Sequence, residues 1–127
     1  MRRMALRGIH HVQVNVTDVG RAVAFYESLG MAVRSDRPDV GSEGAWLDAG
    51  GQQLHLSKKE SVPDGAGQHF ALELDDLDAV LAALRARGIE ANEPRSLGPG
   101  LGRQTVVRDP DGHPVELREP AEVLARG

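Results

Sequence analysis

The chain contains the same unit twice, and this repeat limits the folds open to it. A shift of 58 positions (69 − 11) places the segment beginning at His69 on the segment beginning at His11. Both segments contain an alternating strand pattern, a short acidic turn and a helical pattern that ends in glycine, at Gly30 and Gly88. Internal similarity at a fixed spacing indicates two copies of one supersecondary unit.

Hydrophobic periodicity predicts the elements of each unit. Residues 9–16 alternate between polar and apolar, which predicts a half-buried strand, and the period then becomes helical, with Thr17 or Asp18 as the N-cap. The second unit repeats this order, with a strand at 69–74 and a helix from Leu77. The expected short strands lie near 31–36, 44–49 and 52–58 in the first unit, and near 89–93, 103–109 and 113–119 in the second.

The order is therefore βαβββ in both halves, and the predicted fold class is α+β. Each unit is a short sheet with one helix on its apolar face, too small to bury that face alone. We expect a single domain over residues 1–127, with module one at about 8–58 and module two at about 67–119. Helices on the outer face leave the opposite faces free to form one cupped sheet around a cleft.

Strand alternation predicts which side chains face this cleft. In strand 52–58, Leu54 and Leu56 point to the helix, so His55 points to the cleft. The same parity places His11, His69 and Glu116 there. Imidazole and carboxylate are ligands for zinc, nickel, iron(II), manganese or cobalt, so these four residues are the candidate metal ligands.

Other polar and aromatic residues are candidates for substrate binding. By parity Gln13, Gln53 and Arg118 face the cleft, and Arg103 is expected near its mouth. The glutamines would donate hydrogen bonds, the arginines would hold an anionic group, and Trp46 would form an apolar wall. Glu116 is the candidate catalytic residue, because it is the one carboxylate of the four and suits proton transfer. His10 is expected on the apolar side of the first strand and outside the site.

Composition excludes several classes of function. With 40% hydrophobic and 27% charged residues, the 127-residue chain resembles an ordinary soluble globular protein. A net charge of −4 gives no basic patch for nucleic acid, and no apolar run predicts a membrane span. The absence of cysteine fits a cytoplasmic location, and it leaves histidine, carboxylate and amide oxygen as metal ligands.

Four motifs resemble the vicinal oxygen chelate superfamily of glyoxalases, bleomycin resistance proteins and extradiol dioxygenases. They are "HVQVNVTDVGRAVAFYESLGM", "GGQQLHL", "HFALELDDLDAVLAALRARGI" and "RDPDGHPVELRE", and the resemblance spans residues 8–119. It implies a divalent metal, a small-molecule substrate and a homodimer whose site is often completed across the interface. His11, His69 and Glu116 match the family's ligand positions, and His55 occupies the fourth, where glyoxalase I usually has glutamate.

Three functions remain open at this level. The first is a metal-dependent, glyoxalase-like lyase or isomerase acting on a small carbonyl or thioester substrate. The second is an iron(II) dioxygenase, disfavoured by the chain's length and by its lack of further acid–base residues. The third is a binding protein that sequesters a drug or metabolite, disfavoured by the full set of ligand positions and by an aromatic content of 3%.

Overall fold

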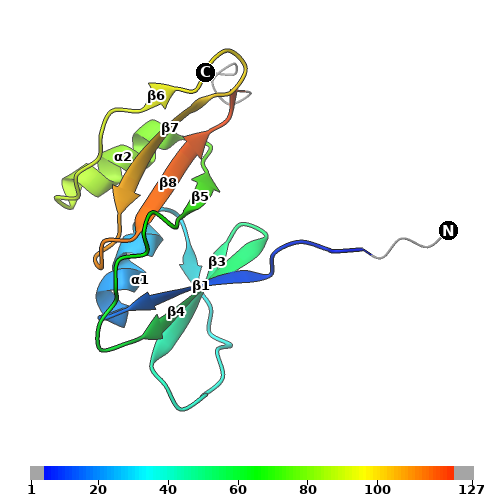
Figure 1. The fold of residues 1–127 in the computed structure, drawn as a ribbon, viewed down its shortest axis with the longest axis vertical. Coiled ribbons are helices and arrows are strands. Elements are labelled where there is room, and N and C mark those ends of the chain that lie inside the picture. The colour runs from blue at the N-terminus through cyan, green and yellow to red at the C-terminus, as the bar shows by residue number, and fades with distance from the viewer. Residues whose placement is uncertain (1–4, 122–127) are drawn as a thin grey trace.

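The computed structural model describes residues 5–121, which form two four-stranded mixed sheets with one helix each (Figure 1). The first sheet has the strand order β1-β4-β3-β2 and the second β5-β8-β7-β6. In both, the first strand pairs parallel with the last, and the other pairings are antiparallel. The elements of the first half are β1 (His11–Val16), α1 (Val19–Ser28), β2 (Ala32–Val33), β3 (Gly44–Ala49) and β4 (Gln52–Lys58).

The second half repeats this topology, so the prediction of an α+β fold from tandem βαβββ modules is confirmed. Its elements are β5 (Phe70–Glu73), α2 (Leu77–Ala86), β6 (Arg95–Ser96), β7 (Arg103–Arg108) and β8 (Pro114–Glu119). No helix within residues 5–121 has the length and apolar character needed to cross a membrane.

One predicted strand lies in a different place. A strand was predicted near 89–93. After α2, however, the next strand that pairs in the second sheet is β6, at Arg95–Ser96. Ile89 and Ala91 pack against the core, so these residues are apolar because they are partly buried and not because they form a strand. The Thr105 hydroxyl donates to the Asn92 carbonyl at 3.0 Å, a side-chain bond in place of a sheet bond.

Both helices begin and end as their sequences predict. Asp18 caps α1 by accepting a hydrogen bond from the Arg21 amide, and Asp76 caps α2 in the same way from Ala79, each at 3.0 Å. Gly30 and Gly88 follow the helices with φ values of 102° and 79°, in the region that favours glycine.

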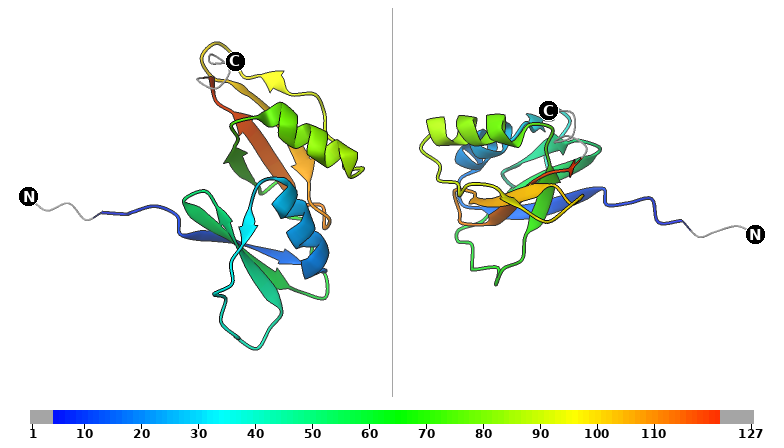
Figure 2. Two further views of the ribbon diagram at one scale, coloured as in Figure 1. Left: turned by 180° about the vertical axis from the view of Figure 1, so that it is seen from behind. Right: turned by 90° about the horizontal axis from the view of Figure 1, so that it is seen from above.

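The helices lie on the same side of the two sheets (Figure 2). Buried side chains of α1, among them Phe25 and Tyr26, meet the inner faces of β3 and β4. Leu81 and Leu84 of α2 join the same core together with the inner residues of β7 and β8. Each sheet therefore buries its helix-facing side and leaves the other free for polar side chains, as the alternation predicted.

Two aspartates of the β7–β8 turn connect the halves. Asp111 accepts hydrogen bonds from the amide and the hydroxyl of Thr17, at 3.0 and 2.6 Å. Asp109, whose side chain is fully buried, accepts one from the Tyr26 hydroxyl at 2.7 Å and lies 2.7 Å from Nδ1 of His113. The chain thus fixes the end of module two against the start of module one.

Candidate metal centre

His11 and His55 lie together on the first sheet. They occupy adjacent parallel strands, β1 and β4, in which Gln13 is opposite His55 and His11 is opposite Gln53. The two imidazole rings stack with their centroids 3.9 Å apart and their planes 11° apart. We refer to these two residues as the histidine pair.

Trp46 completes a stack of three rings. It lies opposite His55 in the β3–β4 register, and its ring is 4.4 Å from the imidazole at an angle of 9°. His55 is 8% exposed between these neighbours, and its Nε2 lies 2.8 Å from Oε1 of Gln53. Burial first, and then the charges of His11, His10, Arg37 and Arg34, lower the pKa of His55. A neutral imidazole keeps the lone pair that a metal ligand needs.

His69 and Glu116 form a second pair on the other sheet. His69 immediately precedes β5, and Glu116 lies opposite Ala71 on the neighbouring strand β8. Nε2 of His69 is 3.2 Å from Oε1 of Glu116, and its Nδ1 is 2.9 Å from the Gly67 carbonyl oxygen. Both ring nitrogens face acceptors, so Gly67 and then Glu116 raise the pKa of His69. We refer to these residues as the histidine–glutamate pair.

The two pairs remain separate within one chain. Across the described part of the chain, no group of three or more histidine, aspartate or glutamate side chains is close enough to hold a metal ion. Each pair joins a terminal strand of its sheet to the neighbouring strand, β1 to β4 in the first sheet and β5 to β8 in the second. One chain therefore contains two separate pairs of potential ligands.

The predicted substrate residues divide between the two pairs. Gln13, Gln53 and Trp46 belong to the surroundings of the histidine pair. Arg118 lies beside the other pair, with its Nε 3.6 Å from Oε2 of Glu116.

Arg103 differs from the expectation that it lies near the mouth of the cleft. It shares the helix-facing parity of Thr105 in β7, and its guanidinium bonds to Glu119 and to Asp78 of α2, each at 2.9 Å. The sequence pattern predicted the strand that contains Arg103, but it did not predict the contacts with Glu119 and Asp78.

His10 corrects a second expectation. The interpretation that it faces the apolar side is wrong, because its side chain is exposed and its Nδ1 lies 2.9 Å from Nδ1 of His11. Its ring is 6.4 Å from His55. His10 precedes the first residue of β1, so strand alternation does not extend to it.

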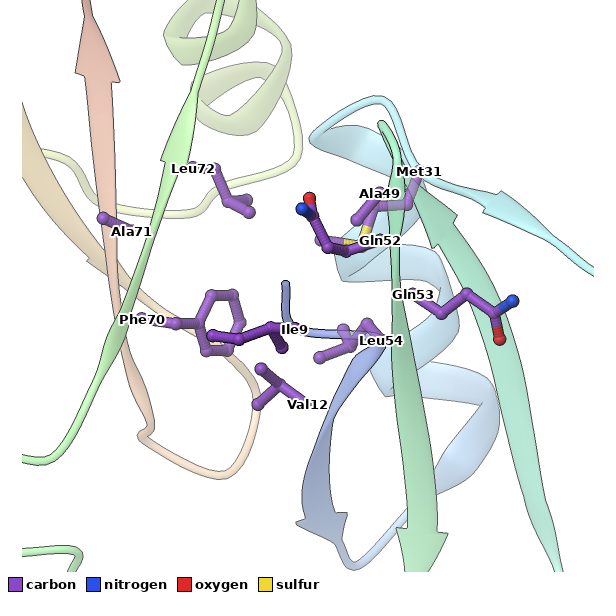
Figure 3. Close-up of a pocket in the computed structure, with 10 residues that line it drawn as sticks. All are labelled: Ile9, Val12, Met31, Ala49, Gln52, Gln53, Leu54, Phe70, Ala71 and Leu72. Atoms are coloured by element: carbon purple, nitrogen blue, oxygen red, sulfur yellow. The ribbon is translucent and has the colours of Figure 1, made fainter. Parts of the chain in front are cut away.

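An apolar pocket of about 370 Å³ lies between the two halves (Figure 3). Ile9, Val12 and Leu54 form one side, and Phe70 and Leu72 of β5 form the other. None of the four candidate ligands lines this pocket. Ile9 is 66% exposed and Val12 36%, so apolar surface remains uncovered beside the edge strand β1.

Residues 8–117 match the family model described as the Glyoxalase/Bleomycin resistance protein/Dioxygenase superfamily. The chain belongs to this superfamily. It is 32% identical to a lactoylglutathione lyase of Haemophilus influenzae, over 87% of this chain and 91% of that protein.

Solved structures include both a binding protein and a resistance protein. TnmS3, an antibiotic binding protein from Streptomyces sp. CB03234, is 30% identical, with a TM-score of 0.73 and coverage of 93% of this chain and 99% of that one. FosX, a fosfomycin resistance protein from Listeria monocytogenes, shares the fold with a TM-score of 0.77 at 20% identity, over 91% of this chain and 94% of that one. Superfamily membership is thus compatible with catalysis and with binding.

Proposed function

We propose that this protein is a divalent-metal-dependent, glyoxalase-like enzyme of the lyase or isomerase type, acting on a small carbonyl or thioester substrate. Superfamily membership and the similarity to a lactoylglutathione lyase support an enzymatic role. The observation that carries the proposal is the pair of ligand groups, each on the polar face of a sheet and each joining its terminal strand to the neighbouring strand.

The donor atoms suit a divalent metal. Three imidazoles and one carboxylate match zinc, nickel, iron(II), manganese or cobalt. The lowered pKa of His55 keeps that ring neutral. Nδ1 of His69 is held by the Gly67 carbonyl, an arrangement that typically orients Nε2 of a ligating histidine toward the metal. A bound metal would supply Lewis-acid stabilisation of negative charge on substrate oxygens.

We further propose that the complete centre forms between two copies of the chain. The histidine pair of one copy would meet the histidine–glutamate pair of the other when β1 lies beside β5 of the partner. Edge strands expose unpaired backbone groups, and Ile9 and Val12 add apolar surface next to β1. A homodimer with two equivalent sites follows from the symmetry of this contact.

Glu116 is the proposed proton carrier. It is the one carboxylate among the four candidates, and Arg118 lies near its Oε2. A carboxylate there can accept a proton from a substrate carbon and return it to a neighbouring atom. Gln13, and Gln53 if it releases His55, would donate hydrogen bonds to substrate oxygens.

Metal analysis of mixed variants tests the proposal without a known substrate. We expect the purified protein to bind a divalent metal near-stoichiometrically, and both His11→Ala and Glu116→Ala to lose it. Equal mixing of the two variants, after exchange of subunits, should restore about one quarter of the wild-type metal content, because half of the dimers are mixed and each holds one intact site.

The control is a mixture of His11→Ala with His55→Ala, in which both changes affect the same pair and no intact site forms. If the mixture of His11→Ala and Glu116→Ala restored no metal although each variant forms dimers, the site between chains would be refuted. If the wild-type protein bound no divalent metal when offered, the enzyme proposal would fail.

A binding protein is the second candidate, and a specific feature favours it. The stack of Trp46, His55 and His11 presents flat rings to a planar ligand, and the antibiotic binding protein TnmS3 is 30% identical. Ligand binding unaffected by chelation would support this candidate over the enzyme. Iron as the bound metal would favour the dioxygenase alternative.

A further inference from the structure

Arg37 lies against the first sheet close to the ring stack. A Cβ atom built on Gly44 would be 2.8 Å from Nη2 of Arg37 and 2.3 Å from the Leu56 carbonyl oxygen. The backbone contact requires glycine at this position, and the missing side chain leaves room for the guanidinium. The side chain of Arg37 is therefore seated on β3 and is partly buried.

The strand register places Gly44, beside this guanidinium, two residues from Trp46 of the ring stack. Gly44 is opposite Ser57, and Trp46 is opposite His55. Two residues along a strand span roughly 7 Å.

A comparison with Arg34 shows what distinguishes Arg37. Arg34 also belongs to this side of the sheet, but its guanidinium bonds to Asp36 at 2.7 and 2.9 Å and to Asp48 at 2.7 Å. Arg37 makes one hydrogen bond, from Nη2 to the Ser42 carbonyl oxygen at 3.1 Å. Among residues 5–121, no carboxylate forms an ion pair with Arg37.

We propose that Arg37 anchors an anionic group of the substrate. Its planar guanidinium would bind a carboxylate or phosphate-type oxyanion in a two-point contact, while other substrate oxygens lie at the metal centre. The substrate class is then a short carbonyl or thioester compound that carries such an anion. This inference rests on the proposed function only for the binding of the substrate's other oxygens at the metal; anion binding by Arg37 does not depend on it.

Trp46 provides the probe for a direct binding test. It is the chain's single tryptophan, so intrinsic fluorescence reports on the neighbourhood of Arg37. Malonate, methylphosphonate and the uncharged malonamide would be titrated into the protein, with chelator and separately with manganese. Calorimetry on the same samples gives Kd, and elemental analysis gives the metal content.

We expect malonate or methylphosphonate to bind with a change in Trp46 fluorescence, and malonamide not to bind. Whichever anion binds more tightly identifies the group as planar or tetrahedral. Arg37→Ala should raise Kd about tenfold or more, since a charge-assisted hydrogen bond is lost. The Kd of Arg37→Lys should lie between those of the wild type and Arg37→Ala, because lysine keeps the charge without the two-point geometry.

Arg21→Ala is the matched control, an arginine on α1 without an ion pair among the described residues. It should leave Kd unchanged. Equal Kd values for wild type and Arg37→Ala, or no anion binding by the wild type, would overturn the proposal. Loss of metal binding with intact anion binding in chelator would refute the metal centre alone, so the two failures are distinguishable.

Discussion

At the residue scale, the imidazole of His69 lies between two hydrogen-bond acceptors, one at each ring nitrogen. The Gly67 carbonyl fixes Nδ1–H, so the proton on Nε2, facing Glu116, is the one a metal would replace. Tyr26 presents the opposite case. Burial and the adjacent Asp109 raise its pKa, which keeps the hydroxyl protonated as a structural donor. One residue is suited to chemistry and the other to holding the fold.

The raised pKa of His69 predicts a pH dependence with a definite sign. Stabilisation from its protonated form is fully present below its ordinary value of 6.5, and is lost as pH rises through the raised value in the folded protein. Metal affinity should increase over the same interval, because the metal competes with that proton. Imidazole NMR titration of chelated protein should place the midpoint above 6.5.

Glu116→Gln should move this midpoint down toward the ordinary value, since it removes the carboxylate that favours the imidazolium. Glu73→Gln is the matched control, an exposed carboxylate on β5 that makes no contact with His69. A wild-type midpoint at or below 6.5 would contradict the arrangement of His69 between two acceptors.

At the element scale, the start of α2 depends on a residue from the last strand. Glu119 is 4% exposed, and its carboxylate accepts hydrogen bonds from the Leu77 amide at 2.8 Å and from Nε of Arg103 at 2.9 Å. The negative charge also faces the positive end of the helix dipole. Arg103 therefore joins the sheet to the helix.

Glu119→Gln should lower the free energy of unfolding by about 1–3 kcal/mol, because one of these buried charged contacts is lost and an amide group meets a donor. Urea denaturation measures this change. Asp78→Asn removes the exposed partner of Arg103 and should cost no more than about 1 kcal/mol. Equal losses in the two variants would show that Glu119 has no special role at the helix start.

Arg103 also shows where prediction from sequence ends. Periodicity correctly predicted the order of the elements, and the capping residues correctly predicted the helix starts, because both depend on local sequence. Neither gave the pairing of Arg103 with Glu119, or the displaced strand β6, because these depend on contacts between distant segments. Stacking of His55 between His11 and Trp46 was likewise beyond reach, since it needs the register of three strands.

At the scale of the whole molecule, contacts between the halves concentrate at the helices and the β7–β8 turn. The buried Asp109 accepts from Tyr26, and Arg87 of the helix end donates to the Ala24 carbonyl at 2.7 Å. These bonds hold the sheets in one arrangement while β1 and β5 stay at open edges. The proposed ligands form no group of three or more within residues 5–121, so we expect a second copy of the chain to supply the missing ligands.

This argument predicts that metal loading depends on protein concentration. Ile9→Lys places a charge on exposed apolar surface just before β1 and replaces no proposed ligand, so it should leave the folded chain intact and weaken association. Full burial of an isoleucine contributes about 1.5–3 kcal/mol, so the dimer Kd should rise on the order of tenfold or more. Sedimentation velocity with parallel metal analysis over a dilution series should show dimer and bound metal lost together, at higher concentration in the variant.

Leu101→Lys is the control, because Leu101 is 58% exposed in the loop before β7 and does not line the pocket. Metal content that stayed constant through dissociation would place the site within one chain and require the two sheets to rearrange.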